Sequence, residues 1–273
     1  MRYEAPMPSD AGTPPDAGSP AGGGLRVTSR EPLADGPAEG RLVVLVHGAM
    51  DRATSFTRLM ARLPDWTVLT YDRRGYGRSS HLGPPDAFSD QVDDLLDVLA
   101  GRPAVALGHS LGGDIVLAAA ALRPGSISCA VVWEPPQPWL PFWPSDSTIR
   151  GAGSELDPED RAEWFMRRMV GDRVWDRLPG ATRRQRRAEG HTLNAELDSL
   201  AAPVFDPRRV RIPVLVGRGG RSRPHQRRGA RELASSLPRG ELVEIGDSDH
   251  GAHLSHPGEL AGLIRRVAGV KAP

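Results

Sequence analysis

The stretch AVALGHSLGGDIVLAAAAL, residues 104–122, decides how this chain folds. Its first four residues are apolar and predict a buried strand, whereas its second half favours a helix. The motif G-x-S-x-G lies between them, and its glycines, Gly108 and Gly112, leave room for a very tight turn around Ser110. A strand, a tight turn and a helix in this order hold the serine at the tip of the turn, in front of the helix N-terminus. The stretch therefore predicts a nucleophilic serine.

Further strands and helices alternate along the chain. Short apolar runs predict strands over residues 42–46, 67–72, 127–133, 213–217 and 242–245. Helical patterns cover residues 55–63, 88–100, 111–122, 226–237 and 257–267. Because strands alternate with helical segments, we expect an α/β fold with a mainly parallel sheet that helices cover on both faces.

Two further segments, together with the serine motif, resemble the α/β-hydrolase superfamily over roughly residues 25–270. His47-Gly48-Ala49 ends the first of these strands, and the sequence DRRGYGRS, residues 72–79, ends the second. The resemblance implies the α/β-hydrolase fold with a helical lid insertion, and it points to a bacterial subgroup with a serine nucleophile. It also implies that the backbone N–H groups of Ala49 and Leu111 form an oxyanion hole.

The resemblance places the general base at His250. This histidine follows the last predicted strand and precedes the last predicted helix. A neutral imidazole is suited to proton transfer at neutral pH. His253 and His256 follow closely in the sequence and are alternatives.

The acid that would orient this histidine departs from the superfamily's usual pattern. Most members carry an aspartate after the strand before last, and this chain has Gly220 at that position. Some members carry the acid one strand earlier, where this chain has Glu134. The resulting chain order of serine, acid and histidine fits the superfamily, so we expect Glu134 to be the acid. Asp247 and Asp249, beside the histidine, remain alternatives.

Composition and pattern divide the chain into four segments. Residues 1–24 are rich in Pro, Gly and Ala and predict a disordered tail. Residues 25–136 and 208–273 are expected to form the two parts of the core. Residues 137–207 are expected to form the lid, with helices near 157–170 and 183–201.

Half of the aromatic residues of the chain are concentrated in the predicted lid. They either pack the lid against the core or line a pocket for a hydrophobic substrate. The pocket residues we expect are Met50, His109, Trp139, Trp143 and Trp164.

Composition and motifs also exclude several classes of protein. No stretch approaches the length of a membrane span and no signal-peptide pattern is present, so we expect no membrane association and a cytoplasmic location. The eight histidines and the single cysteine, Cys129, show no metal-ligand spacing, and no nucleotide-binding glycine loop occurs. We therefore expect neither a metal nor a cofactor.

Arginines cluster over residues 183–187 and 218–231. Such clusters could dock an acidic carrier protein, although Lys271 is the only lysine and arginine is simply the general cation of this chain. Nucleic-acid binding is not expected, because no recognition motif accompanies the arginines.

These patterns predict a serine hydrolase that cleaves an ester or a related acyl bond of a hydrophobic small molecule through an acyl-enzyme, most simply a carboxylic ester. A thioesterase, an acyltransferase, a cofactor-free carbon–carbon hydrolase or a perhydrolase would use the same three residues. The alternative from another class is a non-catalytic ligand-binding protein of this fold. That alternative predicts that Glu134 lies far from His250.

Overall fold

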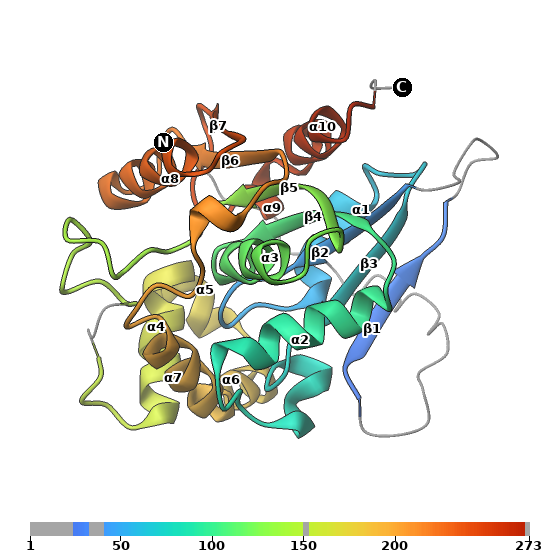
Figure 1. The fold of residues 1–273 in the computed structure, drawn as a ribbon. Coiled ribbons are helices and arrows are strands. Elements are labelled where there is room, and N and C mark those ends of the chain that lie inside the picture. Colours follow the sequence, from blue (N-terminus) through green and yellow to red (C-terminus); the bar gives the residue numbers. More distant parts are fainter. Residues whose placement is uncertain (1–23, 33–40, 150–152, 271–273) are drawn as a thin grey trace.

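A seven-stranded sheet forms the centre of the molecule, with the strand order β1-β3-β2-β4-β5-β6-β7 (Figure 1). The computed structural model describes residues 24–32, 41–149 and 153–270. The expected tail over residues 1–24 thus lies outside the described residues, except for its last position. The strands are β1 (Arg26–Arg30), β2 (Leu42–Val46), β3 (Thr67–Asp72), β4 (Ala104–His109), β5 (Ile127–Trp133), β6 (Val214–Gly219) and β7 (Gly240–Ile245). Only β1 and β3 pair antiparallel among these described strands, which confirms the expected mainly parallel sheet.

Alternate residues of the central strands enter two separate hydrophobic cores, one on each face of the sheet. Val44 of β2 packs in the core under α2 (Phe88–Leu99), α3 (Leu111–Leu122) and α8 (Pro224–Ser236). Val43 enters the other core, which α1 (Thr57–Met60), α9 (Ala252–Ser255) and α10 (Pro257–Val267) cover. Successive side chains of a strand point to opposite faces, so a continuous apolar run such as LVVLV needs cover on both.

Four helices are inserted between β5 and β6, and we call them the cap. They are α4 (Pro158–Val170), α5 (Asp172–Arg177), α6 (Gly180–Ala188) and α7 (Gly190–Ser199), and Figure 1 shows them side by side at one end of the sheet. Their apolar side chains, among them Phe165 and Trp175, form a third core with Met50 and Tyr76. Met50 and Tyr76 follow β2 and β3, so the cap packs on the loops at the carboxyl ends of these strands.

Several elements differ from the sequence-based expectation. The helix predicted over residues 183–201 is two helices, α6 and α7, which meet at Glu189. The helix predicted over residues 55–63 is a short 3-10 helix, η1 (Ala53–Phe56), followed by the single turn α1. Strand β1 and helix α5 were not predicted, because neither has a continuous apolar run. By contrast, α3 and α10 have the predicted bounds.

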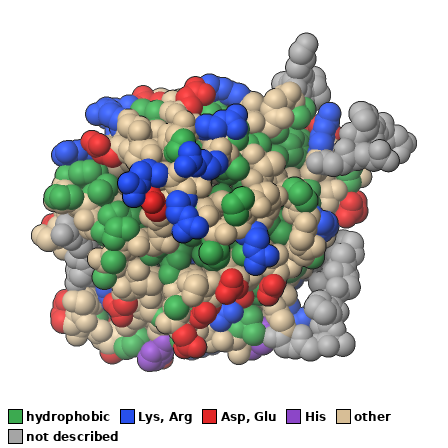
Figure 2. Space-filling view, viewed as in Figure 1, with side chains coloured by type: hydrophobic (Ala, Val, Ile, Leu, Met, Phe, Trp, Pro, Cys, Tyr) green, Lys and Arg blue, Asp and Glu red, His purple; other side chains and the backbone are tan. Residues whose placement is uncertain are grey.

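No helix in the described part of the chain is both long and apolar enough to cross a membrane. Figure 2 shows arginine side chains spread over the upper part of one face, where α8 lies in Figure 1. Many arginines pair within the chain: Arg218 lies 2.7 Å from Glu244, and Arg187 contacts three acidic residues of α4. These internal pairs account for part of the arginine content without an acidic partner.

Candidate active site

The serine motif forms a strained turn between β4 and α3. Ser110 has φ 52° and ψ −129°, a backbone conformation that non-glycine residues rarely adopt and that costs on the order of 1–3 kcal/mol. A Cβ atom on Gly108 would lie 2.4 Å from the Gly112 carbonyl oxygen, and one on Gly112 would lie 2.2 Å from that of Val46. The motif therefore needs glycine on both sides of the serine because the backbone approaches too closely for any side chain.

Register brings the serine and the predicted acid to the same edge of the sheet. His109 of β4 pairs with Trp133 of β5, so the next residues, Ser110 and Glu134, follow neighbouring strands at their carboxyl ends. The backbone N–H of Ser110 donates to the Trp133 carbonyl at 2.8 Å, which extends the pairing into the turn.

Glu134 and His250 form a hydrogen bond of 2.9 Å between Oε2 and Nδ1. Glu134 is 2% exposed, has a positive φ of 48°, and accepts a second hydrogen bond at 2.8 Å from the backbone N–H of Gly219 through Oε1. An ionised carboxylate only accepts hydrogen bonds, so Nδ1 of His250 carries the proton and Nε2 is left as the base. The sequence-predicted acid and base are therefore in direct contact.

The two alternative acids have other partners. The carboxylate of Asp247 lies 3.2 Å from His256 Nε2, and that of Asp249 accepts from the backbone N–H of Gly251 at 2.9 Å. His253, an alternative base, lies 3.3 Å from Asp51. The contacts thus favour Glu134 over both aspartates.

The lack of space around Gly220 explains why this chain cannot carry an acid at the usual position. A Cβ atom on Gly220 would lie 2.2 Å from the Gly246 carbonyl oxygen and under 3 Å from two further backbone atoms of Gly246. The Gly220 backbone N–H also donates to the Ile245 carbonyl, which ties the two loops together. A side chain at position 220 would therefore require the backbone before His250 to move.

Two contacts that sequence analysis did not predict hold the loop of His250. The His109 ring lies 2.9 Å from the His250 carbonyl oxygen through Nε2, and the Trp133 indole donates to the Asp249 carbonyl at 3.2 Å. His109 was expected only as a pocket residue, and no sequence signal marks Trp133, because the two side chains reach this loop only through the register of β4 and β5.

The two backbone groups expected to form the oxyanion hole have no protein acceptor within the described residues. Leu111 is the first residue of α3, where backbone N–H groups have no partner within the helix. Ala49 precedes Met50, whose φ is 56°. Free N–H groups beside the elbow suit a developing negative charge.

The expected pocket residues separate into two groups. Met50 and Trp164 both belong to the core that the cap forms over the loop after β2. Trp139 packs against the core under α3 and α8, and Trp143 makes an edge contact with His225 of α8 at a centroid distance of 4.8 Å. His109 is buried beside His250.

Asp51, His109 and His253 bring one ligand atom each within 4.8 Å of one another and could hold a metal ion. In this structure the two imidazole rings lie against each other, with centroids 4.0 Å apart, and His253 is hydrogen-bonded to Asp51. Burial lowers the pKa of His109 well below its ordinary value, and the ring of His253 lowers it further. Their spacing in the sequence carried no metal signal.

An acid–histidine pair and a strained serine turn at the carboxyl edge of a parallel sheet are the architecture of an α/β hydrolase. Residues 43–263 match the alpha/beta hydrolase family, and the chain belongs to this family. This confirms the superfamily inferred from the sequence motifs.

Relatives of this chain carry hydrolase names. The chain is 26% identical over 257 residues to the "Putative carbamate hydrolase RutD" of Caulobacter segnis, an alignment that covers 85% of this chain and 94% of that protein. It is 33% identical over 123 residues to the monoacylglycerol lipase of Mycolicibacterium smegmatis, covering 41% of this chain and 44% of the lipase.

Solved structures agree on the fold. An alpha/beta hydrolase from Sphaerobacter thermophilus has a TM-score of 0.65 at 26% identity, covering 92% of this chain and 99% of that one. The enol-lactonase of Burkholderia xenovorans has the same TM-score at 21% identity, covering 90% of this chain and 97% of that one. The family match and the names of the relatives support a hydrolase, and the two solved structures support the fold.

Proposed function

We propose that this protein is a serine hydrolase that cleaves an ester or a related acyl bond of a hydrophobic small molecule. The observation that carries the proposal is the 2.9 Å hydrogen bond from His250 to the buried carboxylate of Glu134, beside a serine on a strained turn. A carboxylate in this position holds the imidazole tautomer that leaves Nε2 free, and it stabilises the imidazolium that forms during reaction.

In the proposed mechanism the Ser110 hydroxyl attacks the substrate carbonyl while His250 Nε2 takes its proton. The negative charge that develops on the carbonyl oxygen is held by the N–H groups of Ala49 and Leu111, and one such donor typically contributes about 10²- to 10³-fold in rate. His250 then delivers the proton to the leaving group, and water releases the acyl group from the serine. None of these steps needs a cofactor.

The apolar side chains of the cap favour a hydrophobic substrate. Its apolar side chains, Phe165 and Met166 among them, pack over Met50 and Ala49, next to the proposed oxyanion hole. An apolar cover beside an active site excludes water and strengthens the electrostatic interactions within it. A carboxylic ester is the simplest substrate of this kind. The single cysteine is buried and unpaired, which is compatible with the cytoplasm as the place of action.

Thioesterase, acyltransferase, carbon–carbon hydrolase and perhydrolase chemistry share these residues, so substrate tests must separate them. The non-catalytic alternative predicts a large distance between Glu134 and His250. The 2.9 Å contact argues against that alternative.

Labelling with a fluorophosphonate probe tests the proposal. We expect the wild-type protein to be labelled on Ser110, and Ser110→Ala to lose labelling completely while it remains folded. Ser255→Ala, which removes a solvent-exposed serine of α9, is the matched control and should be labelled like wild type. A folded wild-type protein that reacts with neither the probe nor any ester, thioester or lactone would contradict the proposal.

A further inference from the structure

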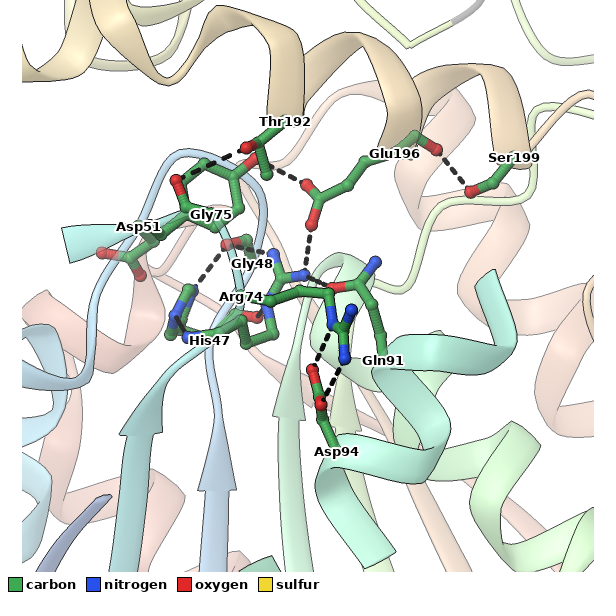
Figure 3. Close-up of polar contacts among 12 residues, drawn as sticks. His47, Gly48, Asp51, Arg74, Gly75, Gln91, Asp94, Thr192, Glu196 and Ser199 are labelled. Atoms are coloured by element: carbon green, nitrogen blue, oxygen red, sulfur yellow. Dashed lines mark hydrogen bonds and ion pairs between the residues drawn. The ribbon is translucent and has the colours of Figure 1, made fainter. Parts of the chain in front are cut away.

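A buried ion pair connects the core to the cap beside the proposed active site. Arg73, directly after β3, is 1% exposed, and its guanidinium Nη1 pairs with Glu196 of α7, which is fully buried. The Tyr76 hydroxyl donates to the second oxygen of Glu196 at 2.6 Å. Figure 3 shows Glu196 extending from its helix toward the loop of His47 and Gly48. Buried ion pairs contribute little net stability, because removing both charges from water is costly.

The rest of the Arg73 side chain holds two carbonyl groups of the loop after β2. Its Nε donates to the His47 carbonyl and its Nη2 to the Gly48 carbonyl, each at 2.9 Å. The Arg73 backbone N–H donates to Nε2 of His47 at 3.0 Å. Nδ1 of His47 therefore carries the proton and donates to the same Gly48 carbonyl at 2.8 Å.

These contacts fix the peptide between Gly48 and Ala49. In a trans peptide the C=O and the following N–H lie in one plane and point in opposite directions. Two donors on the Gly48 carbonyl therefore set the direction of the Ala49 N–H, the group expected in the oxyanion hole. That N–H has no acceptor of its own within the described part of the chain, so the carbonyl side is what orients it.

Arg73 Nη1 is held from two sides, by the amide oxygen of Gln91 in α2 and by Glu196 of the cap, and the cap supplies the negative charge. Burial alone would lower the pKa of the guanidinium, but Glu196 and the neighbouring tyrosines hold it above its ordinary value. Glu196 is the carboxylate partner of Arg73 in the described residues, and it belongs to the cap rather than the core. The cap also contacts this loop directly, because Arg186 of α6 donates to the carbonyl of Met50.

We propose that Glu196 and Arg73 are positioning residues that couple cap docking to the oxyanion hole. When the cap is docked, Glu196 holds Arg73, and Arg73 aims the Ala49 N–H at the reacting carbonyl. When the cap moves away, Arg73 loses its counter-charge and the Gly48–Ala49 peptide loses its fixed orientation. The inference rests on the proposed serine hydrolase function.

Glu196→Gln tests the coupling, with Glu163→Gln as the matched control. Both variants remove one carboxylate charge from the cap, but among the residues that the structure describes Glu163 pairs only with cap residues, namely Arg167, Trp175 and Arg187. We expect Glu196→Gln to lower kcat for a p-nitrophenyl ester by about 10- to 100-fold with KM changed less than threefold, somewhat less than complete loss of one oxyanion donor. The affinity for an alkyl boronic acid, which forms a tetrahedral adduct, should fall by the same factor as kcat. The control should stay within twofold of wild type.

Amide hydrogen exchange of the segment 47–50 gives a readout that does not need activity. We expect faster exchange in Glu196→Gln than in Glu163→Gln, while β4 and α3 exchange as in wild type. Unchanged kcat, inhibitor affinity and exchange in Glu196→Gln would overturn the coupling while leaving the proposed function intact. If no substrate is found, the function fails, and exchange alone still decides the coupling. If Glu196→Gln does not fold, Tyr76→Phe removes the hydroxyl contacts to Glu196 and to the Met50 backbone and should give the same pattern with a smaller effect.

Discussion

The two sides of the candidate active site are held by different means. The nucleophile side, with Ser110, Glu134 and His250, comes entirely from the core, and backbone geometry at the ends of β4, β5 and β6 fixes it. The oxyanion side is a loop whose carbonyls are held by Arg73, whose charge is balanced by the cap. The residues of the nucleophile side are therefore positioned by the core alone, whereas the loop of the oxyanion side is positioned by the core and by its contact with the cap.

Replacing Glu134 should have the largest effect on the nucleophile side. Glu134→Gln keeps the shape of the side chain but removes the charge that selects the tautomer of His250. We expect kcat/KM to fall by about 10³- to 10⁴-fold, or about 4–5 kcal/mol of transition-state stabilisation, with little change in melting temperature. Steady-state ester hydrolysis measures this.

Asp247→Asn and Asp249→Asn are the controls for this variant. Both residues lie on the same loop as His250, but their carboxylates contact His256 and the Gly251 backbone instead. Each should retain at least half of the wild-type kcat/KM. If either aspartate variant loses activity as strongly as Glu134→Gln, the acid is assigned to the wrong strand.

Adding a single methyl group at Gly220 should destabilise the nucleophile side. Because the new Cβ would lie 2.2 Å from the Gly246 carbonyl, Gly220→Ala must displace the loop before His250. We expect the free energy of unfolding to fall by about 1–3 kcal/mol, together with a loss of activity. Unfolding in denaturant measures the change in the free energy of unfolding.

Gly246→Ala is the matched control, since a Cβ there has nothing within 4 Å. It should change the free energy of unfolding by less than about 1 kcal/mol. Equal stabilities of the two variants would show that the close approach at Gly220 is not a constraint.

The oxyanion side should respond to acid through His47. Burial, followed by the charge of Arg73, lowers the pKa of His47 to about 3. Unfolding exposes the ring, whose ordinary pKa is about 6.5. Below pH 6.5 the unfolded chain therefore binds a proton that the folded protein does not, and stability falls as the pH falls toward 3. Between pH 7.5 and 5 we expect a loss of about 2 kcal/mol from this group.

Unfolding in denaturant at these two pH values, for wild type and His47→Asn, isolates this contribution. The variant should be less stable at pH 7.5, but it should lose about 2 kcal/mol less than wild type on going to pH 5. The same pH dependence in both proteins would mean that His47 is not held neutral by the fold.

Sequence reasoning was most accurate where local chemistry is sufficient. The glycines of the serine motif and the apolar run after it fix the bounds of α3 without help from the rest of the chain. The predictions were wrong where long-range contacts determine the backbone conformation. The predicted helix over residues 183–201 breaks at Glu189 and Gly190 because Glu189 binds Arg52 and the Gly77 backbone, and Gly190 packs against the Pro158 carbonyl.

By itself, the sequence determined the parallel α/β architecture and the serine turn, and it indicated Glu134 and His250 as the acid and base. Strand periodicity and turn chemistry are local properties of neighbouring residues, which is why a sequence can carry them. Only the tertiary structure decided that Glu134 reaches His250 and that Gly220 has no room for a side chain. Only the tertiary structure brought a cap glutamate to the arginine that holds the Gly48 carbonyl. These contacts join residues from 25 to over 100 positions apart, and their geometry depends on strand register and cap docking.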